Sequence, residues 1–186
     1  EEDALLRTRF NLPALHSDEQ GYFLHRQYWH LLIERLGMDY QKVLRDDPHY
    51  HDTATALIEF SRGKEHGGYR EAFAHLADEI LPRAVILYVN VSFSESLRKN
   101  RKRFNPDRPD SILEHGLSDE KMEILYKEDD WAELAGEACG RIELRGQAVP
   151  YAVFANEDDV TTGKPGLLAS RLEIVLGKLW ELQQAR

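Results

Sequence analysis

A cluster of basic side chains at 97–108 is the strongest chemical signal in the sequence. Six cations stand there against the single anion Asp107, a charge of +5 in a chain whose net charge is −9. The six are Arg98, Lys99, Arg101, Lys102, Arg103 and Arg108. Phosphoryl transfer needs cations that neutralise the moving group, and planar arginine suits this better than lysine. A positive island on an acidic protein favours a small anionic ligand over a long polyanion.

Helical spacing predicts which of these cations act together. Steps of three and four residues place Arg98, Arg101 and Lys102 on one face, whereas Arg103 joins Lys99. A solvated basic face is the plain alternative. An RNA-contacting helix is a third interpretation, which the scarcity of aromatic residues beyond Phe104 disfavours, so we expect no nucleic-acid partner.

A carboxylate at the end of a predicted strand is the second chemical signal. Residues 54–60 are apolar on both faces, which predicts a buried parallel strand. Glu59 lies at the end of this segment, where ligands gather in open α/β sheets. Its carboxylate could hold the water of a magnesium ion or accept the proton of a substrate hydroxyl. The alternative is a structural Glu59 paired with Arg62.

Polar residues on both sides of this strand are candidates for substrate binding. His51 and Asp52 precede it, and Lys64 and Arg70 belong to a glycine-rich basic loop that follows it. A simple connection is the default interpretation of that loop. The spacing of His49 and His51 is one that some metal-dependent hydrolases use, so such a hydrolase is a further alternative.

The pattern of elements predicts one α/β domain over residues 1–186. Further strands are expected at 84–91, 142–144 and 149–154. Helices are expected from the Ser17–Gln20 capping box to Gly37, from Asp39 to Leu44, at 73–80, after the Ser92–Glu95 capping box, at 119–135, and along the leucine stripe at 168–182. We expect a three-layer sandwich, with a mostly parallel sheet flanked by helices.

From residue 54 onward the order of elements resembles the P-loop kinases, the superfamily of nucleoside and nucleotide kinases. The first matching feature is Glu59-Phe60-Ser61-Arg62 at a strand end. The second is the strand 88–92 followed by Glu95 and the arginines of 98–103. The third is the strand 149–154, which leads into 156–159 and a last helix. The resemblance implies a P-loop NTPase-like fold with an Arg-rich lid at about 94–118.

The chain departs from this family at its defining motif. The phosphate loop Gly-x-x-x-x-Gly-Lys-Ser/Thr does not occur, because Lys64 is followed by Glu65 and Lys164 by Pro165. In the family that loop follows the first strand, which lies in the middle of the sheet. We therefore expect the N-terminal strand and phosphate loop to precede Glu1 in the natural chain. A degenerate member that has replaced the loop is the alternative.

The resemblance implies an ATP-dependent phosphotransferase that uses ATP and magnesium and acts on a small hydroxyl-bearing metabolite or nucleoside. The residues expected to be catalytic are Glu59, Arg62, Arg98 and Arg101, with magnesium near Glu59. The residues expected to contact the nucleotide are Arg101, Lys102, Asn156 and Asp158. A catalytically inactive nucleotide- or anion-binding regulatory module is the alternative that the missing phosphate loop favours.

Composition limits where the protein works. The longest uninterrupted apolar run, 84–89, is far shorter than the ~20 residues of a membrane span. The single cysteine, Cys139, excludes an internal disulfide framework and a multi-cysteine zinc site. We expect a cytoplasmic protein without a membrane partner. The leucine stripe of the last helix is expected to pack on the sheet, with a homodimer seam as the alternative.

Overall fold

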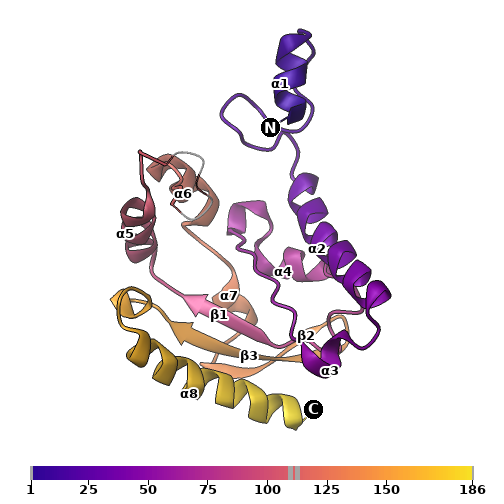
Figure 1. Ribbon diagram of the computed structural model, residues 1–186, viewed down its shortest axis with the longest axis vertical. Coiled ribbons are helices and arrows are strands. Elements are labelled where there is room, and N and C mark those ends of the chain that lie inside the picture. Colours follow the sequence, from indigo (N-terminus) through magenta and orange to yellow (C-terminus); the bar gives the residue numbers. More distant parts are fainter. Residues whose placement is uncertain (1, 109–110, 112–113, 186) are drawn as a thin grey trace. The chain divides into compact units, whose positions relative to one another are not determined.

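A three-stranded mixed sheet with strand order β1–β3–β2 forms the centre of the fold (Figure 1). The computed structural model describes residues 2–108, 111 and 114–185. The strands are β1 (Ile86–Asn90), β2 (Cys139–Leu144) and β3 (Gln147–Ala155). β1 is parallel to β3, and β2 is antiparallel to it. The predicted α/β class is confirmed, but the sheet is small and mixed rather than mostly parallel.

The predicted strand at 54–60 is wrong. The structure gives this segment no regular secondary structure, and the side chain of Leu57 is 93% exposed. Glu59 is exposed as well, and therefore does not lie at a strand end. An apolar run becomes a strand only where a neighbour takes up its backbone hydrogen bonds, and none of the described strands pairs with this one.

The strands expected at 142–144 and 149–154 are confirmed, and they form a hairpin. Arg145 and Gly146 have φ values of 48° and 77°, as in a two-residue type I′ turn, and Leu144 pairs with Gln147. The segment 149–152 of β3 is buried at every position, because β3 is the middle strand and has cover on both faces.

The chain divides into two compact units, Glu1–Ile58 with His75–Ala77, and Glu59–Ala74 with Asp78–Arg186. The first unit contains α1 (Glu2–Arg9), α2 (Gln27–Asp46) and α3 (Tyr50–Thr53). The second contains the sheet together with η1 (Lys64–His66), α4 (Gly68–Ala74), α5 (Phe93–Arg103), α6 (Asp119–Tyr126), α7 (Trp131–Leu134), η2 (Asp159–Thr161) and α8 (Pro165–Gln184).

Two helix boundaries in the first unit were predicted wrongly. Ser17 does not cap a helix: it forms an isolated bridge with Phe23, and α2 begins only at Gln27. Gly37 does not end α2, which continues to Asp46. A Cβ at Gly37 would lie 2.7 Å from the Cβ of Ala77. The glycine therefore serves close packing against residue 77 rather than helix termination.

Helices and aromatic side chains cover the sheet of the second unit. α8 packs along β3, on the side of the sheet opposite α4 and α7 (Figure 1). On the α7 side, the ring of Trp131 stacks on Tyr88 with centroids 4.3 Å apart and meets the edge of Tyr151 at 5.5 Å. Among the described helices none is long and apolar enough to cross a membrane.

The carboxylate of Asp130 joins the start of α4 to the start of α7. It is 6% exposed and accepts hydrogen bonds from the backbone N–H groups of Tyr69 at 2.6 Å and Arg70 at 3.1 Å. Gly68 has a φ of +65°, and a Cβ there would collide with this carboxylate. The backbone N–H of Lys64 also donates to the carbonyl of Glu128 at 2.8 Å. The predicted 119–135 helix is interrupted at this junction and becomes α6 and α7.

We expect Asp130→Ala to lower the free energy of unfolding by about 3 kcal/mol, because two buried N–H groups lose a charged acceptor. Urea denaturation measures the change. The matched control is Glu128→Gln, an exposed neighbour, which should change stability by less than about 0.5 kcal/mol. Equal stability of Asp130→Ala and the unsubstituted protein would show that this carboxylate does not hold the two segments together.

Candidate functional site

α5 begins directly after β1, at the N-cap that the sequence predicted. The Ser92 hydroxyl accepts from the backbone N–H of Glu95 at 3.4 Å. The reciprocal partner differs from the prediction, because the backbone N–H of Ser92 donates to Glu157. The Ser92 hydroxyl also donates to Glu157, at 2.8 Å. Glu157 thus completes the cap, and Glu95 is available to bind cations.

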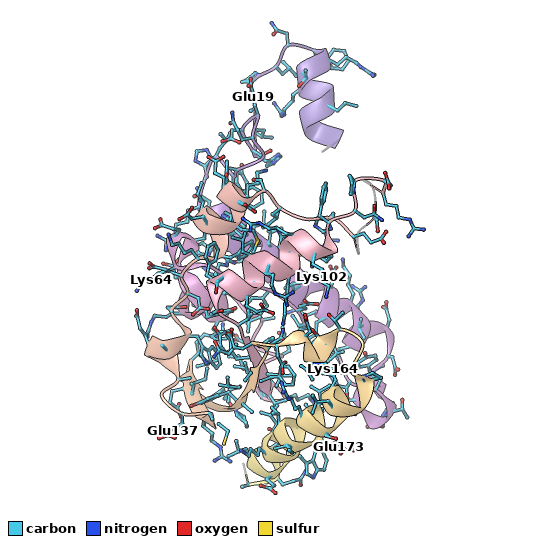
Figure 2. All side chains as sticks on the ribbon, turned by 90° about the vertical axis from the view of Figure 1, so that its left-hand side faces the viewer. Glu19, Lys64, Lys102, Glu137, Lys164 and Glu173 are labelled. Atoms are coloured by element: carbon cyan, nitrogen blue, oxygen red, sulfur yellow. The ribbon has the colours of Figure 1, made fainter. Side chains whose placement is uncertain are left out.

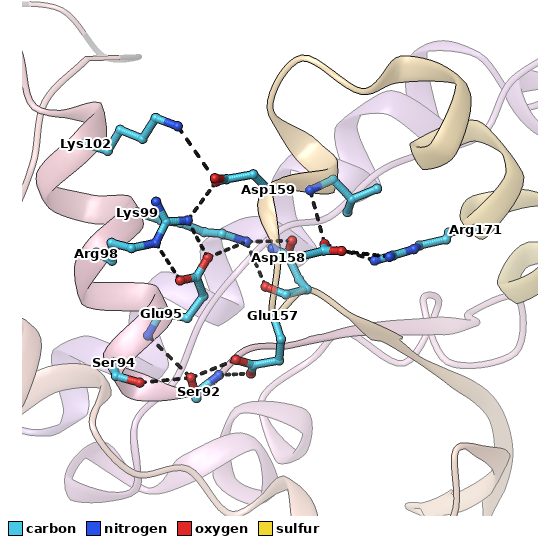
Figure 3. A network of polar contacts seen from close by, with 12 residues as sticks. Ser92, Ser94, Glu95, Arg98, Lys99, Lys102, Glu157, Asp158, Asp159 and Arg171 are labelled. Carbon is cyan, nitrogen blue, oxygen red and sulfur yellow. Dashed lines mark hydrogen bonds and ion pairs between the residues drawn. The ribbon is translucent and has the colours of Figure 1, made fainter.

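One face of α5 is held to the loop after β3 by a network of charges (Figure 3). Arg98 donates to Glu95 at 2.6 Å and to Asp159 at 2.7 Å. Lys99 donates to the backbone and side-chain oxygens of Asn156, both at 2.7 Å. The Lys102 Nζ lies 3.8 Å from Asp159, and Figure 2 labels Lys102 on α5 and Lys164 just before α8. This face therefore serves as a contact between α5 and the 156–159 loop.

The electrostatics of this network follow from the hydrogen bonds of Arg98. Those hydrogen bonds hold the pKa of Glu95 and of Asp159 below their ordinary values of 4.5 and 3.8. A lowered pKa means that the ionised carboxylates favour the folded contact. The attraction is complete above pH 4.5 and is lost as the pH falls through the lowered pKa values.

Arg103 differs from the other cations of the basic cluster. Arg101 pairs with Asp119, with Nε to Oδ1 at 3.1 Å, and Arg108 pairs with Glu114 at 3.0 Å. The predicted grouping of Arg98, Arg101 and Lys102 is therefore wrong, because residue 101 turns toward α6. Arg103 donates through Nε to the carbonyl of His115 at 3.1 Å, and no carboxylate of the described residues pairs with it.

A cavity of about 460 Å³ lies at the carboxyl end of β1, on the second face of α5. α5 contributes Phe93, Ser96 and Arg103, which follow helical spacing. The other residues around the cavity are Ser61, Tyr69, Tyr88, Val89, Val91, His115, Leu117, Met122, Tyr126, Lys127 and Asp129. The cavity therefore combines aromatic and apolar walls with a larger share of polar surface, to which both cations and a carboxylate contribute.

Tyr88 and Asp129 form a fixed polar pair in this cavity. The Tyr88 hydroxyl donates to Asp129 Oδ2 at 2.7 Å, and the backbone N–H of Trp131 donates to Oδ1 at 2.9 Å. Burial first, and then the hydrogen bond to the carboxylate, raise the pKa of Tyr88 far above its ordinary value. The hydroxyl therefore stays protonated at every physiological pH.

A second cavity, of about 470 Å³, lies at the carboxyl end of β3 against α8. Its walls include Val153, Phe154 and Ile174, with Asp158 and Arg171 as polar groups. Asp158 accepts from both terminal nitrogens of Arg171, at 3.0 and 2.8 Å. Of the predicted nucleotide contacts, Asp158 thus borders a cavity, whereas Asn156 binds a lysine of α5.

The remaining predicted residues have other partners. Arg62 is 2% exposed and donates to the carbonyl of His66 at 3.3 Å. Lys64 pairs with Glu133 at 2.7 Å, and the backbone N–H of Arg70 donates to the carboxylate of Asp130.

In the first unit, His51 Nε2 lies 2.7 Å from the Tyr40 hydroxyl, and Asp52 lies 3.1 Å from His49. Ser61, rather than Glu59, borders the first cavity.

The described residues do not form a magnesium site of their own. Among them no three His, Cys, Asp or Glu side chains come close enough to hold a metal ion, either at Glu59 or at His49 and His51. The described chain also has no glycine-rich loop of the phosphate-binding type. We therefore derive no reaction step through magnesium.

Sequence reasoning placed Arg103 in the basic cluster but not among the predicted catalytic residues, and it missed the Tyr88–Asp129 pair. A signal for Arg103 was present, because residues 93, 96, 100 and 103 recur at helical spacing and define a second face of α5. Asp129 had no such signal. Its position depends on the clamp made by its neighbour Asp130, which joins segments about 60 residues apart.

We expect Arg98→Ala to raise the pKa of Glu95 and of Asp159 toward 4.5 and 3.8, because it removes the main hydrogen-bond donor to both. NMR titration of the carboxyl carbons measures both values. Asp119, whose pKa is lowered by Arg101, is the internal control and should not change. Unchanged values for Glu95 and Asp159 would contradict the network.

The chain has no match among family models, curated proteins or solved structures. The features that point to a function are therefore the two faces of α5, the two cavities and the polar contacts around them. All of these belong to the second compact unit.

Proposed function

We propose that the protein is an ATP-dependent phosphotransferase of the P-loop kinase type, acting on a small hydroxyl-bearing metabolite. The observation that carries the proposal is that a cavity lies at the carboxyl end of each of two parallel strands, and that α5 borders the first cavity and binds the loop that follows the second strand. A reaction that joins two small molecules needs two adjacent sites. In open α/β sheets, ligands bind at this edge.

The proposal assigns the metabolite to the cavity at β1 and the nucleotide to the cavity at β3. Both volumes, about 460 and 470 Å³, suit small molecules. The walls at β3 are mainly apolar, which suits a base, and Asp158 and Arg171 supply polar contacts. The cavity at β1 holds Arg103, a cation that can meet the phosphoryl group.

The protein's contribution to such a reaction is positioning and charge neutralisation. Arg103 would bind the phosphoryl group directly, since the described carboxylates leave its charge uncompensated. Arg98 and Arg101 remain predicted lid residues and would first have to leave Asp159 and Asp119. Glu59, the proton acceptor expected from the sequence, borders neither cavity and therefore has no part in this proposal.

An inactive anion-binding module is the second candidate, and one observation favours it. Five of the six cations of the basic cluster, all but Arg103, already pair with carboxylates. Cations that are paired in this way cannot neutralise a moving phosphoryl group, so a nucleotide could bind without being turned over. Binding of ATP without turnover would favour this candidate.

We expect Arg103→Ala to lower the magnesium-dependent turnover of ATP with a panel of nucleosides and sugars by about 10- to 100-fold, because a charge-assisted hydrogen bond is lost. Arg108→Ala removes the same charge from the same cluster and should have little effect. Arg101→Ala tests the sequence-based assignment separately. Equal rates for Arg103→Ala and the unsubstituted protein would remove Arg103 from the mechanism.

A further inference from the structure

We infer that Tyr88 and Asp129 determine specificity in the cavity at β1, by requiring a hydrogen-bond donor at the end of the substrate remote from Arg103. The inference rests on the proposed function, because it takes this cavity as the metabolite site. It adds a property that the phosphotransferase proposal does not contain: the substrate is polar at both ends, with N–H or O–H groups at one end and the phosphoryl position at the other.

The carboxylate of Asp129 has lone pairs that no hydrogen bond among the described residues uses. Each carboxylate oxygen has two lone pairs. Oδ1 uses one for the backbone N–H of Trp131 and Oδ2 uses one for the Tyr88 hydroxyl. One lone pair remains on each oxygen, and the carboxylate offers no hydrogen. Asp129 can therefore accept from a ligand but cannot donate to it.

Tyr88 is restricted in the same way. Its hydroxyl has one hydrogen, which is already given to Asp129 at 2.7 Å. The stack of its ring on Trp131, with 5° between the planes, holds the ring and therefore the hydroxyl oxygen in place. Tyr88 therefore also presents only lone pairs to the cavity. The two residues together make an end that accepts hydrogen bonds and repels carbonyl or anionic groups.

Arg103 lies at the other end of the cavity. It is the last residue of α5, which starts beside the end of β1, so about 15 Å of helix separates Phe93 from Arg103. Between the two polar ends, the walls include Phe93, Met122 and Tyr126. A ligand that fills this space has an apolar or aromatic middle, a donor group at the Asp129 end and an anionic group at the Arg103 end.

Isothermal calorimetry with two matched probes tests this inference, with the proposed nucleotide cavity at β3 saturated by a non-hydrolysable ATP analogue. Adenosine 5′-monophosphate has an exocyclic amine, whereas purine riboside 5′-monophosphate has the same ring and phosphate without any N–H on the ring. We expect the unsubstituted protein to bind the amine-bearing probe at least about tenfold more tightly. Asp129→Asn places an amide donor in the acceptor position and should reduce this ratio to near one. Tyr88→Phe keeps the stack on Trp131 and should also lower the ratio.

The controls separate this inference from the proposed function. Glu120→Gln changes an exposed carboxylate of α6 that does not border the cavity, and it should leave the ratio unchanged. Equal binding of the two probes by the unsubstituted protein would overturn the inference and leave the phosphotransferase proposal standing. A ratio that survives both Asp129→Asn and Tyr88→Phe would show that other residues select the donor. Failure of both probes to bind at millimolar concentration would overturn the inference and the assignment of the cavity together.

Discussion

The buried carboxylate of Asp130 is the contact on which the candidate site depends. It accepts the first backbone N–H groups of α4 and so fixes 68–70 against 129–131. Its neighbours on either side are Asp129, which borders the cavity, and Trp131, which stacks on β1. One hydrogen-bonded acid thus determines where the acceptor end of the cavity lies relative to the sheet. The positive φ of Gly68 is the backbone requirement of this arrangement.

α5 connects the cavity at the end of β1 to the loop that follows β3. Its first turn is capped from two segments, because Ser92 supplies one acceptor and Glu157 replaces Glu95 as the reciprocal partner. The released Glu95 then joins Arg98 and the loop after β3 in an ion-pair network. These pairs are exposed and each adds little to stability. Their importance is that they compensate the charges of the other cations. Among the described cations of the cluster, Arg103 alone has no carboxylate partner.

Several local signals in the sequence predicted the local structure, although the capping box at Ser17 did not. The strand expected at 84–91, the strands expected at 142–144 and 149–154, and the cap at Ser92 each depend on residues close together in the chain. Predictions that depended on distant partners failed. The segment 54–60 lacks a strand to pair with, and Gly37 has a packing role against residue 77 that no helix-end rule contains. The acceptor pair of Tyr88 and Asp129 joins residues 41 apart, so no motif could have identified it.

The central claim is that a small anionic ligand occupies the cavity at the carboxyl end of β1, between Arg103 and Asp129. A crystal structure of the protein soaked with adenosine 5′-monophosphate and a non-hydrolysable ATP analogue, which fills the proposed nucleotide cavity at β3, tests it most directly. The account predicts density for the monophosphate in the cavity at β1, with its phosphate at the Arg103 guanidinium and its ring beside Tyr88. Density for the ATP analogue at β3 together with solvent alone in the cavity at β1 would contradict it.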